Sequence, residues 1–118
     1  MINRKRAPLI KDPVEFDIKL PPCEKFVLTN GVEVYSVNSG SEDTLMLNLV
    51  FFAGNCYEES NTVAAATNNL LKNGTSRLSA FDLNEHFDYH GAYFNPSCYN
   101  ETAEITVHCL TRHIDNLL

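Results

Sequence analysis

The sequence predicts an α+β fold with a largely antiparallel sheet and helices packed on one face of it. Three observations predict this fold class. Residues 61–75 have the pattern of one helix with a marker at each end, and Asn30-Gly31 joins two β-rich runs, which is a strong hairpin signal. Residues 103–109 alternate between apolar and polar side chains, as in an antiparallel strand with one buried face.

The size and charge of the chain exclude several classes of protein. Its 118 residues, 44% of them hydrophobic, are enough for one modest domain. The net charge is −6, and three of the nine basic residues are Arg4, Lys5 and Arg6, so a nucleic-acid interface is disfavoured. No apolar run reaches the roughly 18 residues of a membrane span, and no apolar signal core follows the first residues. We therefore expect a cytoplasmic protein that binds neither nucleic acid nor membrane.

Residues 1–24 are expected to form an extended N-terminal arm. This segment contains four prolines, Pro8, Pro13, Pro21 and Pro22. Proline resists helix formation and pushes the residue before it towards extended backbone. Apolar and charged residues alternate over 14–20, so part of the arm could lie along a surface as an edge strand.

The next elements are two predicted strand regions. Residues 26–37 are expected to form a hairpin that turns at Asn30-Gly31. Residues 44–53 follow as a long strand with apolar side chains on both faces. Such a strand is expected in the middle of a sheet that is covered, at least in part, on both sides.

Residues 61–75 are expected to form the central helix. Asn61 or Thr62 is expected to cap its first turn, and Gly74 to end its last turn. An apolar stripe should face the core, made of Val63, Ala66, Thr67, Leu70 and Leu71. A second side is small and polar, made of Ala65, Asn68, Asn69 and Lys72. No group on this second side can hold a metal or move a proton at neutral pH.

A second helix, a second hairpin and a third helix complete the chain. Ser79 and Asp82 have the spacing of a capping box, and Gly91 should close the helix that they begin. Its inward side chains are expected to be Ala80, Leu83, Phe87 and Phe81. Residues 92–97 and 101–110 are predicted to form the second hairpin. Residues 111–118 begin a helical pattern without a terminator, which indicates that the chain was cut from a longer one.

Two further groups of residues are considered for chemistry. The cysteines, Cys23, Cys56, Cys98 and Cys109, include no CxxC pair and are expected to be buried free thiols. The acidic residues Glu58, Glu59, Glu101 and Glu104 have no inferred partner and are expected to be solvated charges.

His86 and His90 are spaced as the two histidines of a zinc peptidase helix, at i and i+4. However, Phe87 and Tyr89 occupy the positions where a catalytic glutamate would be needed. His90 also precedes Gly91, where the negative end of a helix dipole favours histidine. Two ordinary surface histidines are therefore favoured, and a metal site at His86 and His90 is the weaker alternative.

Five segments occur in a particular order and spacing: 28–35, 52–58, 73–75, 85–92 and 101–102. In this order they resemble the insulinase/pitrilysin family of zinc peptidases, which includes the mitochondrial processing peptidases. The resemblance covers residues 24–118, about the first half of one family domain. It implies that residues 25–118 are the N-terminal part of an insulinase-like metallohydrolase domain.

The family carries a His-x-x-Glu-His zinc motif on the helix before the Gly-Thr pair. Carried over to this chain, the ligand positions fall on Ala65 and Asn69, and the general-base position falls on Asn68. An alanine has no lone pair to offer, and an amide cannot act as a base near pH 7. The third family ligand, a glutamate, would lie beyond Leu118. The resemblance therefore implies the fold without catalytic or metal-binding residues, and without the zinc of active relatives.

Family domains face each other in pairs across a chamber, with the motif on one side. The resemblance thus implies an inactive homologue that pairs with an active subunit or second domain to form a peptide-binding chamber. It also implies a homo- or hetero-oligomer that receives peptide substrates. Two alternatives remain open: a fragment of an active zinc metalloendopeptidase whose ligands are misaligned here, and a purely structural domain.

Overall fold

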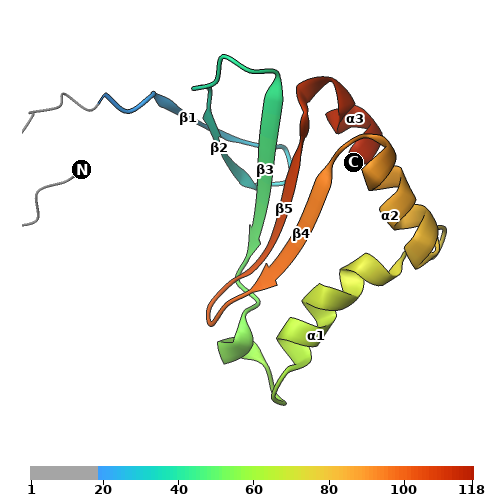
Figure 1. The fold of residues 1–118 in the computed structure, drawn as a ribbon. Coiled ribbons are helices and arrows are strands. Elements are labelled where there is room, and N and C mark those ends of the chain that lie inside the picture. The colour runs from blue at the N-terminus through green and yellow to red at the C-terminus, as the bar shows by residue number, and fades with distance from the viewer. Residues whose placement is uncertain (1–18) are drawn as a thin grey trace, which may run out of the picture. The chain divides into compact units, whose positions relative to one another are not determined.

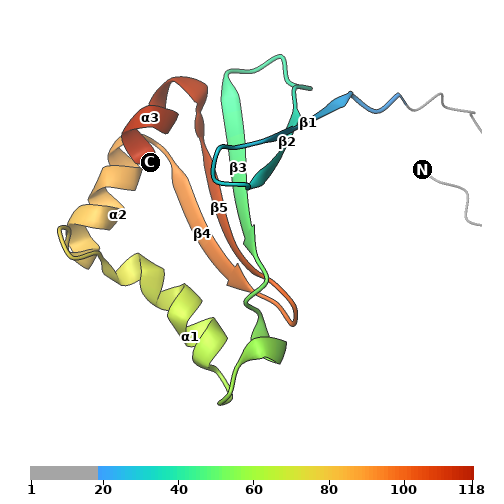
Figure 2. The same cartoon turned by 180° about the vertical axis from the view of Figure 1, so that it is seen from behind.

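The computed structural model describes residues 19–118. The chain divides between Ser39 and Gly40 into two compact units, and Figures 1 and 2 show their elements from opposite sides. The predicted edge strand at 14–20 lies mostly outside the described residues, and its last residue, Leu20, is exposed and outside any strand. None of the described helices is long and apolar enough to cross a membrane.

The first unit contains the hairpin predicted around Asn30-Gly31. Strand β1 (Cys23–Val27) pairs in antiparallel fashion with β2 (Glu33–Val37). Gly31 has a φ of 85°, a conformation that glycine adopts at little cost, and the Leu28 N–H donates to the carbonyl of Val32 at 2.9 Å. The predicted hairpin is therefore confirmed.

The second unit is built on a three-stranded antiparallel sheet in the order β3-β5-β4. These strands are β3 (Thr44–Phe51), β4 (Tyr93–Cys98) and β5 (Ala103–Leu110). The second predicted hairpin is confirmed as β4 and β5. One face of the central strand β5 is buried at Ala103, Val107 and Cys109, as its alternating pattern predicts.

The expectation that residues 44–53 form a covered, central strand is wrong for the described part of the chain. There β3 is an edge strand that pairs with β5. One of its faces is open, and the other is only partly covered, with Leu45 and Leu47 half-buried. Met46 is 64% exposed on one face and Leu49 is 39% exposed on the other. Apolar side chains show that both faces of a strand suit coverage, but they do not say what covers them.

The helices of the second unit are short. They are α1 (Val63–Leu70), α2 (Ala80–Tyr89) and α3 (Ile114–Leu117), with 3-10 turns η1 (Asn55–Tyr57), η2 (Leu71–Asn73) and η3 (Thr111–His113). Figures 1 and 2 show α1 and α2 along one side of the three-stranded sheet. The fold is therefore α+β with antiparallel sheets and helices on one face, as the sequence predicts.

Helix α2 confirms its predicted start and end. The Asp82 N–H donates to Ser79 Oγ and the Ser79 N–H donates to Asp82 Oδ2, each at 3.2 Å, which is a complete capping box. Gly91, with a φ of 60°, follows the helix. The prediction that four of its side chains face inward is confirmed for Ala80, Leu83 and Phe87, which are half-buried. It is wrong for Phe81, which is 73% exposed.

All four cysteines are free thiols, as predicted, but their burial differs from the prediction. Cys109 is buried on the covered face of β5, and burial raises the pKa of its thiol. Cys98 is half-buried. Cys23 and Cys56 are exposed, because neither belongs to a strand or turn face that is covered within its own unit.

Candidate functional site

The candidate site is helix α1, and the side that it turns towards the sheet is not the predicted one. Val63, Leu70 and Leu71 of the predicted core stripe are 51%, 57% and 40% exposed. Two residues of the small and polar side face inward instead, because Asn68 is the buried residue of the helix and Ala65 is half-buried. Small side chains allow α1 to approach β4 and β5 closely. The orientation of α1 is therefore set by how closely its backbone can approach the sheet, and not by the apolar stripe.

The positions that carry over to the zinc motif have different environments. Asn68 is only 6% exposed, and its Nδ2 donates to the backbone carbonyl of Glu104 on β5 at 3.4 Å. Ala65 is half-buried and Asn69 is exposed. The hydrogen bond satisfies a polar group that would otherwise be costly to bury, so Asn68 joins α1 to the sheet.

The start of α1 is capped from a distance and not by the predicted residues. Thr62 has a left-handed φ of 75° and makes no side-chain cap, and Asn61 does not cap the helix either. The carboxylate of Glu58 takes this place by accepting hydrogen bonds from the N–H groups of Thr62 and Ala64, both at 2.9 Å. A carboxylate here also suits the positive end of the helix dipole. Glu58 is therefore not the solvated charge that the sequence suggests.

Glu104 also has partners that the sequence did not reveal. Its carboxylate accepts from Asn48 Nδ2 at 3.3 Å and from Thr102 Oγ1 at 3.2 Å. The bond from Asn48 crosses from β3 to β5, whereas Thr102 directly precedes β5. For Glu59 and Glu101, which are exposed, the expectation of solvated charges fits their burial.

A close backbone contact at Gly54 sets the position of Glu58. The N–H groups of Gly54, Asn55 and Cys56 donate to carbonyls of the 99–101 turn at 3.2, 3.0 and 2.8 Å. A Cβ atom on the buried Gly54 would lie 2.5 Å from the carbonyl oxygens of Tyr99 and Asn100. Only glycine fits this contact without a backbone shift, so the loop that carries Glu58 is fastened to the β4-β5 turn.

A cavity of about 300 Å³ lies between this loop, α1 and β5. Its wall is mostly apolar and includes Ala53, Tyr57, Val63, Thr67, Leu71 and Ala103. Asn68 and Glu58 add polar atoms to the wall, and both are engaged in the hydrogen bonds described above. The cavity therefore suits an apolar group better than a charged one.

The residues at the motif positions do not fit a zinc ion. Ala65 offers no ligand atom, and the amide nitrogen of Asn68 is directed at the Glu104 carbonyl. Zinc in proteins is held by thiolate, imidazole or carboxylate groups. Within residues 19–118, no group of three His, Cys, Asp or Glu side chains is arranged to hold a metal ion.

The alternative pair, His86 and His90, has a third histidine beside it. The ring centroids of His86 and His90 are 5.0 Å apart, and that of His113 lies 5.0 Å from His90. Partial burial, followed by the charges of His113 and His86, lowers the pKa of His90. The sequence did not indicate His113, because only the folded chain brings η3 to the end of α2.

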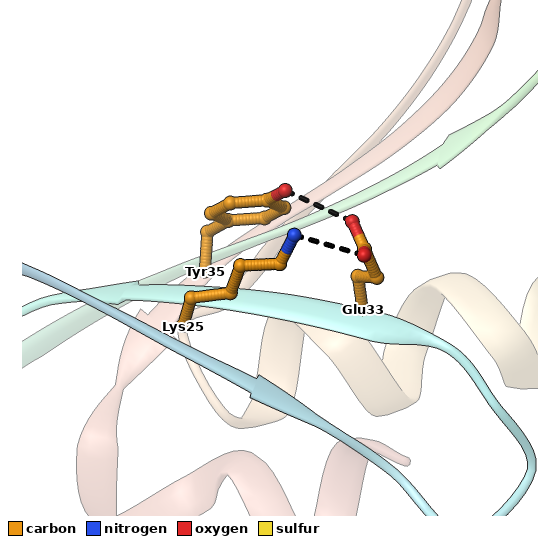
Figure 3. A network of polar contacts seen from close by, with 3 residues as sticks. All are labelled: Lys25, Glu33 and Tyr35. Atoms are coloured by element: carbon orange, nitrogen blue, oxygen red, sulfur yellow. Dashed lines mark hydrogen bonds and ion pairs between the residues drawn. The ribbon is translucent and has the colours of Figure 1, made fainter.

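A separate polar cluster lies on the hairpin of the first unit (Figure 3). Glu33 accepts from Lys25 Nζ at 2.8 Å and from the Tyr35 hydroxyl at 2.9 Å, and Lys25 Nζ lies 5.1 Å from the Tyr35 ring centroid. The bond with Lys25 is the main cause that lowers the pKa of Glu33, and the same bond raises the pKa of Lys25. The cluster is exposed, and its contacts all join residues of the same hairpin, so its role is to stabilise that hairpin.

Solved structures resemble this chain in fold, although no protein-family model and no curated protein matches its sequence. A peptidase M16 inactive domain from Pseudomonas fluorescens matches it with a TM-score of 0.73 and 23% identity, over 80% of this chain and 23% of that one. A protease from Helicobacter pylori matches with a TM-score of 0.73 and 20% identity, over 83% of this chain and 24% of that one. This chain thus spans a small share of each neighbour's length. Its fold is similar to part of an M16 peptidase inactive domain.

Proposed function

We propose that this chain is a non-catalytic insulinase-like peptidase domain that takes no zinc. The observation that carries the proposal is the burial of Asn68, at the position that carries over to the general base. Its amide donates to a carbonyl of β5, and neither Ala65 nor exposed Asn69 supplies a zinc ligand beside it. Zinc hydrolysis needs ligands with available lone pairs and a base that can accept a proton from water.

The proposed role is to pair with an active zinc peptidase subunit or second domain and to complete a peptide-binding chamber with it. The Pseudomonas neighbour is described as an inactive domain, which supports a role without catalysis for this fold. We further propose that the chain acts in the cytoplasm as part of a homo- or hetero-oligomer.

The cavity beside α1 is the proposed contact for an apolar side chain of a bound peptide. Its volume of about 300 Å³ is at the lower end of the range for ligand pockets, and its wall is mainly apolar. Thr67 lines this cavity and is exposed, so it can be exchanged without disturbing the buried side of α1. Ala66 is also exposed but does not line the cavity, so it offers a matched control.

A peptide cleavage and binding experiment tests the proposal. Alone, the chain should cleave no member of a quenched fluorescent peptide pool, with or without added zinc. Mixed with a subunit from the same genome that has an intact His-x-x-Glu-His motif, it should comigrate and increase cleavage. Thr67→Phe should weaken peptide binding about tenfold, equal to roughly 1.4 kcal/mol, and Ala66→Phe should not. Cleavage by the chain alone that a chelator abolishes would overturn the proposal.

A further inference from the structure

Three imidazoles meet where the end of α2 lies beside the start of α3. His86 belongs to α2 and His90 is its C-cap residue, whereas His113 ends η3. The ring centroids are 5.0 Å apart from His86 to His90 and again from His90 to His113. We call His86, His90 and His113 the imidazole cluster. It lies within the second unit, and the proposed function does not use it.

The contacts of the imidazole cluster require a particular protonation state. Arg112 Nε donates to His113 Nε2 at 3.3 Å, and only an unprotonated ring nitrogen can accept this bond. A proton on that nitrogen would place an N–H and a positive charge against the guanidinium. The contact between Arg112 and His113 would then become repulsive.

His86 ties the imidazole cluster to α3. Its Nε2 lies 2.8 Å from the backbone carbonyl oxygen of Asn116, so the ring nitrogen donates and the carbonyl accepts. This bond survives protonation of His86, because the nitrogen already carries its proton. What changes on protonation is the charge of three neighbouring rings, which then repel one another.

The other groups around the imidazole cluster do not neutralise such a charge. On the packed elements these are the Tyr89 ring, 5.2 Å from that of His90, the guanidinium of Arg112, and the exposed carboxylates of Glu85, Asp88 and Asp115. In residues 19–118 no carboxylate forms an ion pair with any of the three rings. The negative end of the α2 dipole favours a cation at His90, but burial and the neighbouring histidines prevail and lower its pKa.

We propose that the imidazole cluster is a pH-sensitive contact that holds α3 at the end of α2 when its rings are neutral and releases α3 when they gain protons. The direction follows from linkage. A histidine with a lowered pKa in the attached state takes its proton more readily when released. The attachment is therefore strongest above the ordinary histidine pKa of 6.5 and weakens as the pH falls below it, towards the lowered pKa of His90.

Nuclear magnetic resonance on the 118-residue chain tests this proposal. When the pH is lowered from about 7.5 to about 5.5, the intensity of the cross-peaks between the His90 and His113 rings should fall at least about threefold. The Cα shifts of residues 114–117 should move towards coil values over the same range. His108, on β5 and facing Tyr93 at 6.3 Å, provides a control, because His108→Gln should leave this response intact.

His113→Gln should remove the response, since glutamine can still accept from Arg112 but does not titrate in this range. His90→Gln, as a second variant, should reduce it as well. The proposal would be overturned by Cα shifts at 114–117 that do not change with pH in the parent chain. It would also be overturned by a response that persists in both His113→Gln and His90→Gln.

Discussion

The N–H of Ala64 donates to the carboxylate of Glu58 at 2.9 Å, so a loop residue caps a helix that begins five positions later. The other carboxylate oxygen accepts from the Thr62 N–H, also at 2.9 Å. Thr62 itself has a left-handed backbone and cannot cap the helix with its own side chain. The start of α1 therefore depends on a residue outside the helix.

Replacing Glu58 should destabilise the second unit through the start of α1. Glu58→Ala removes both hydrogen bonds, and we expect the free energy of unfolding to fall by about 1–2 kcal/mol, as for a lost N-cap. Glu58→Gln should cost less, because one amide oxygen can still accept. Urea unfolding monitored by circular dichroism measures both. Glu59→Ala is the control, and an equal loss in that variant would contradict the capping role.

Gly54→Ala should be more disruptive than its size suggests. The added Cβ would lie 2.5 Å from the carbonyl oxygens of Tyr99 and Asn100, so the loop or the β4-β5 turn must shift. We expect a loss of about 1–3 kcal/mol in unfolding free energy, as for overpacked sites. At Gly40 the nearest atom to an added Cβ is 3.6 Å away, so thermal unfolding of Gly40→Ala gives the comparison. Equal stability of the two variants would refute the close contact.

Asn68→Asp should test the hydrogen bond between α1 and β5. The aspartate is nearly isosteric but places a charged acceptor against the Glu104 carbonyl at a buried position. We expect a loss of at least about 2 kcal/mol near pH 7, with partial recovery at acid pH, where the protonated carboxyl can donate. Chemical denaturation at several pH values follows this change. Asn69→Asp, on the exposed side, should show neither effect.

The extent to which the sequence predicts this fold depends on how local each signal is. The Ser79–Asp82 capping box and the Asn30-Gly31 turn were predicted correctly, because each bond joins residues a few positions apart. The position of β3 was not, because its place at an edge depends on which strands pair with it. Periodicity reports the faces of a strand but not its neighbours.

The candidate site shows the same limit more sharply. The predicted apolar stripe includes Val63, Leu70 and Leu71, whereas the residues that face the sheet are Ala65 and Asn68. The sequence alone does not show that Asn68 donates a hydrogen bond to the carbonyl of Glu104, 36 residues away. This bond is what allows the polar Asn68 side chain to be buried. The sequence does not reveal the capping role of Glu58, because the local signals for the start of α1 point to Asn61 or Thr62.

The hairpin of the first unit should respond to pH through Glu33. Its pKa is lowered, chiefly by the bond with Lys25, so this contact stabilises the hairpin above the ordinary value of 4.5 and is lost as the pH falls through the lowered pKa. The pKa of Lys25 is raised, so the contact is also lost as the pH rises above 10.5. Tyr35 ring shifts in nuclear magnetic resonance should show both transitions. Glu33→Gln should abolish the acid transition, and Glu24→Gln should not.

The most direct test of the central claim is the zinc content of the purified 118-residue chain after dialysis against zinc and then against buffer. Ala65, Asn68 and Asn69 offer no thiolate, imidazole or carboxylate, so we expect far less than one zinc per chain, and no change in thermal stability when zinc is added. A stable content of about one zinc per chain, with a matching rise in thermal stability, would contradict the claim that this domain has lost its metal site.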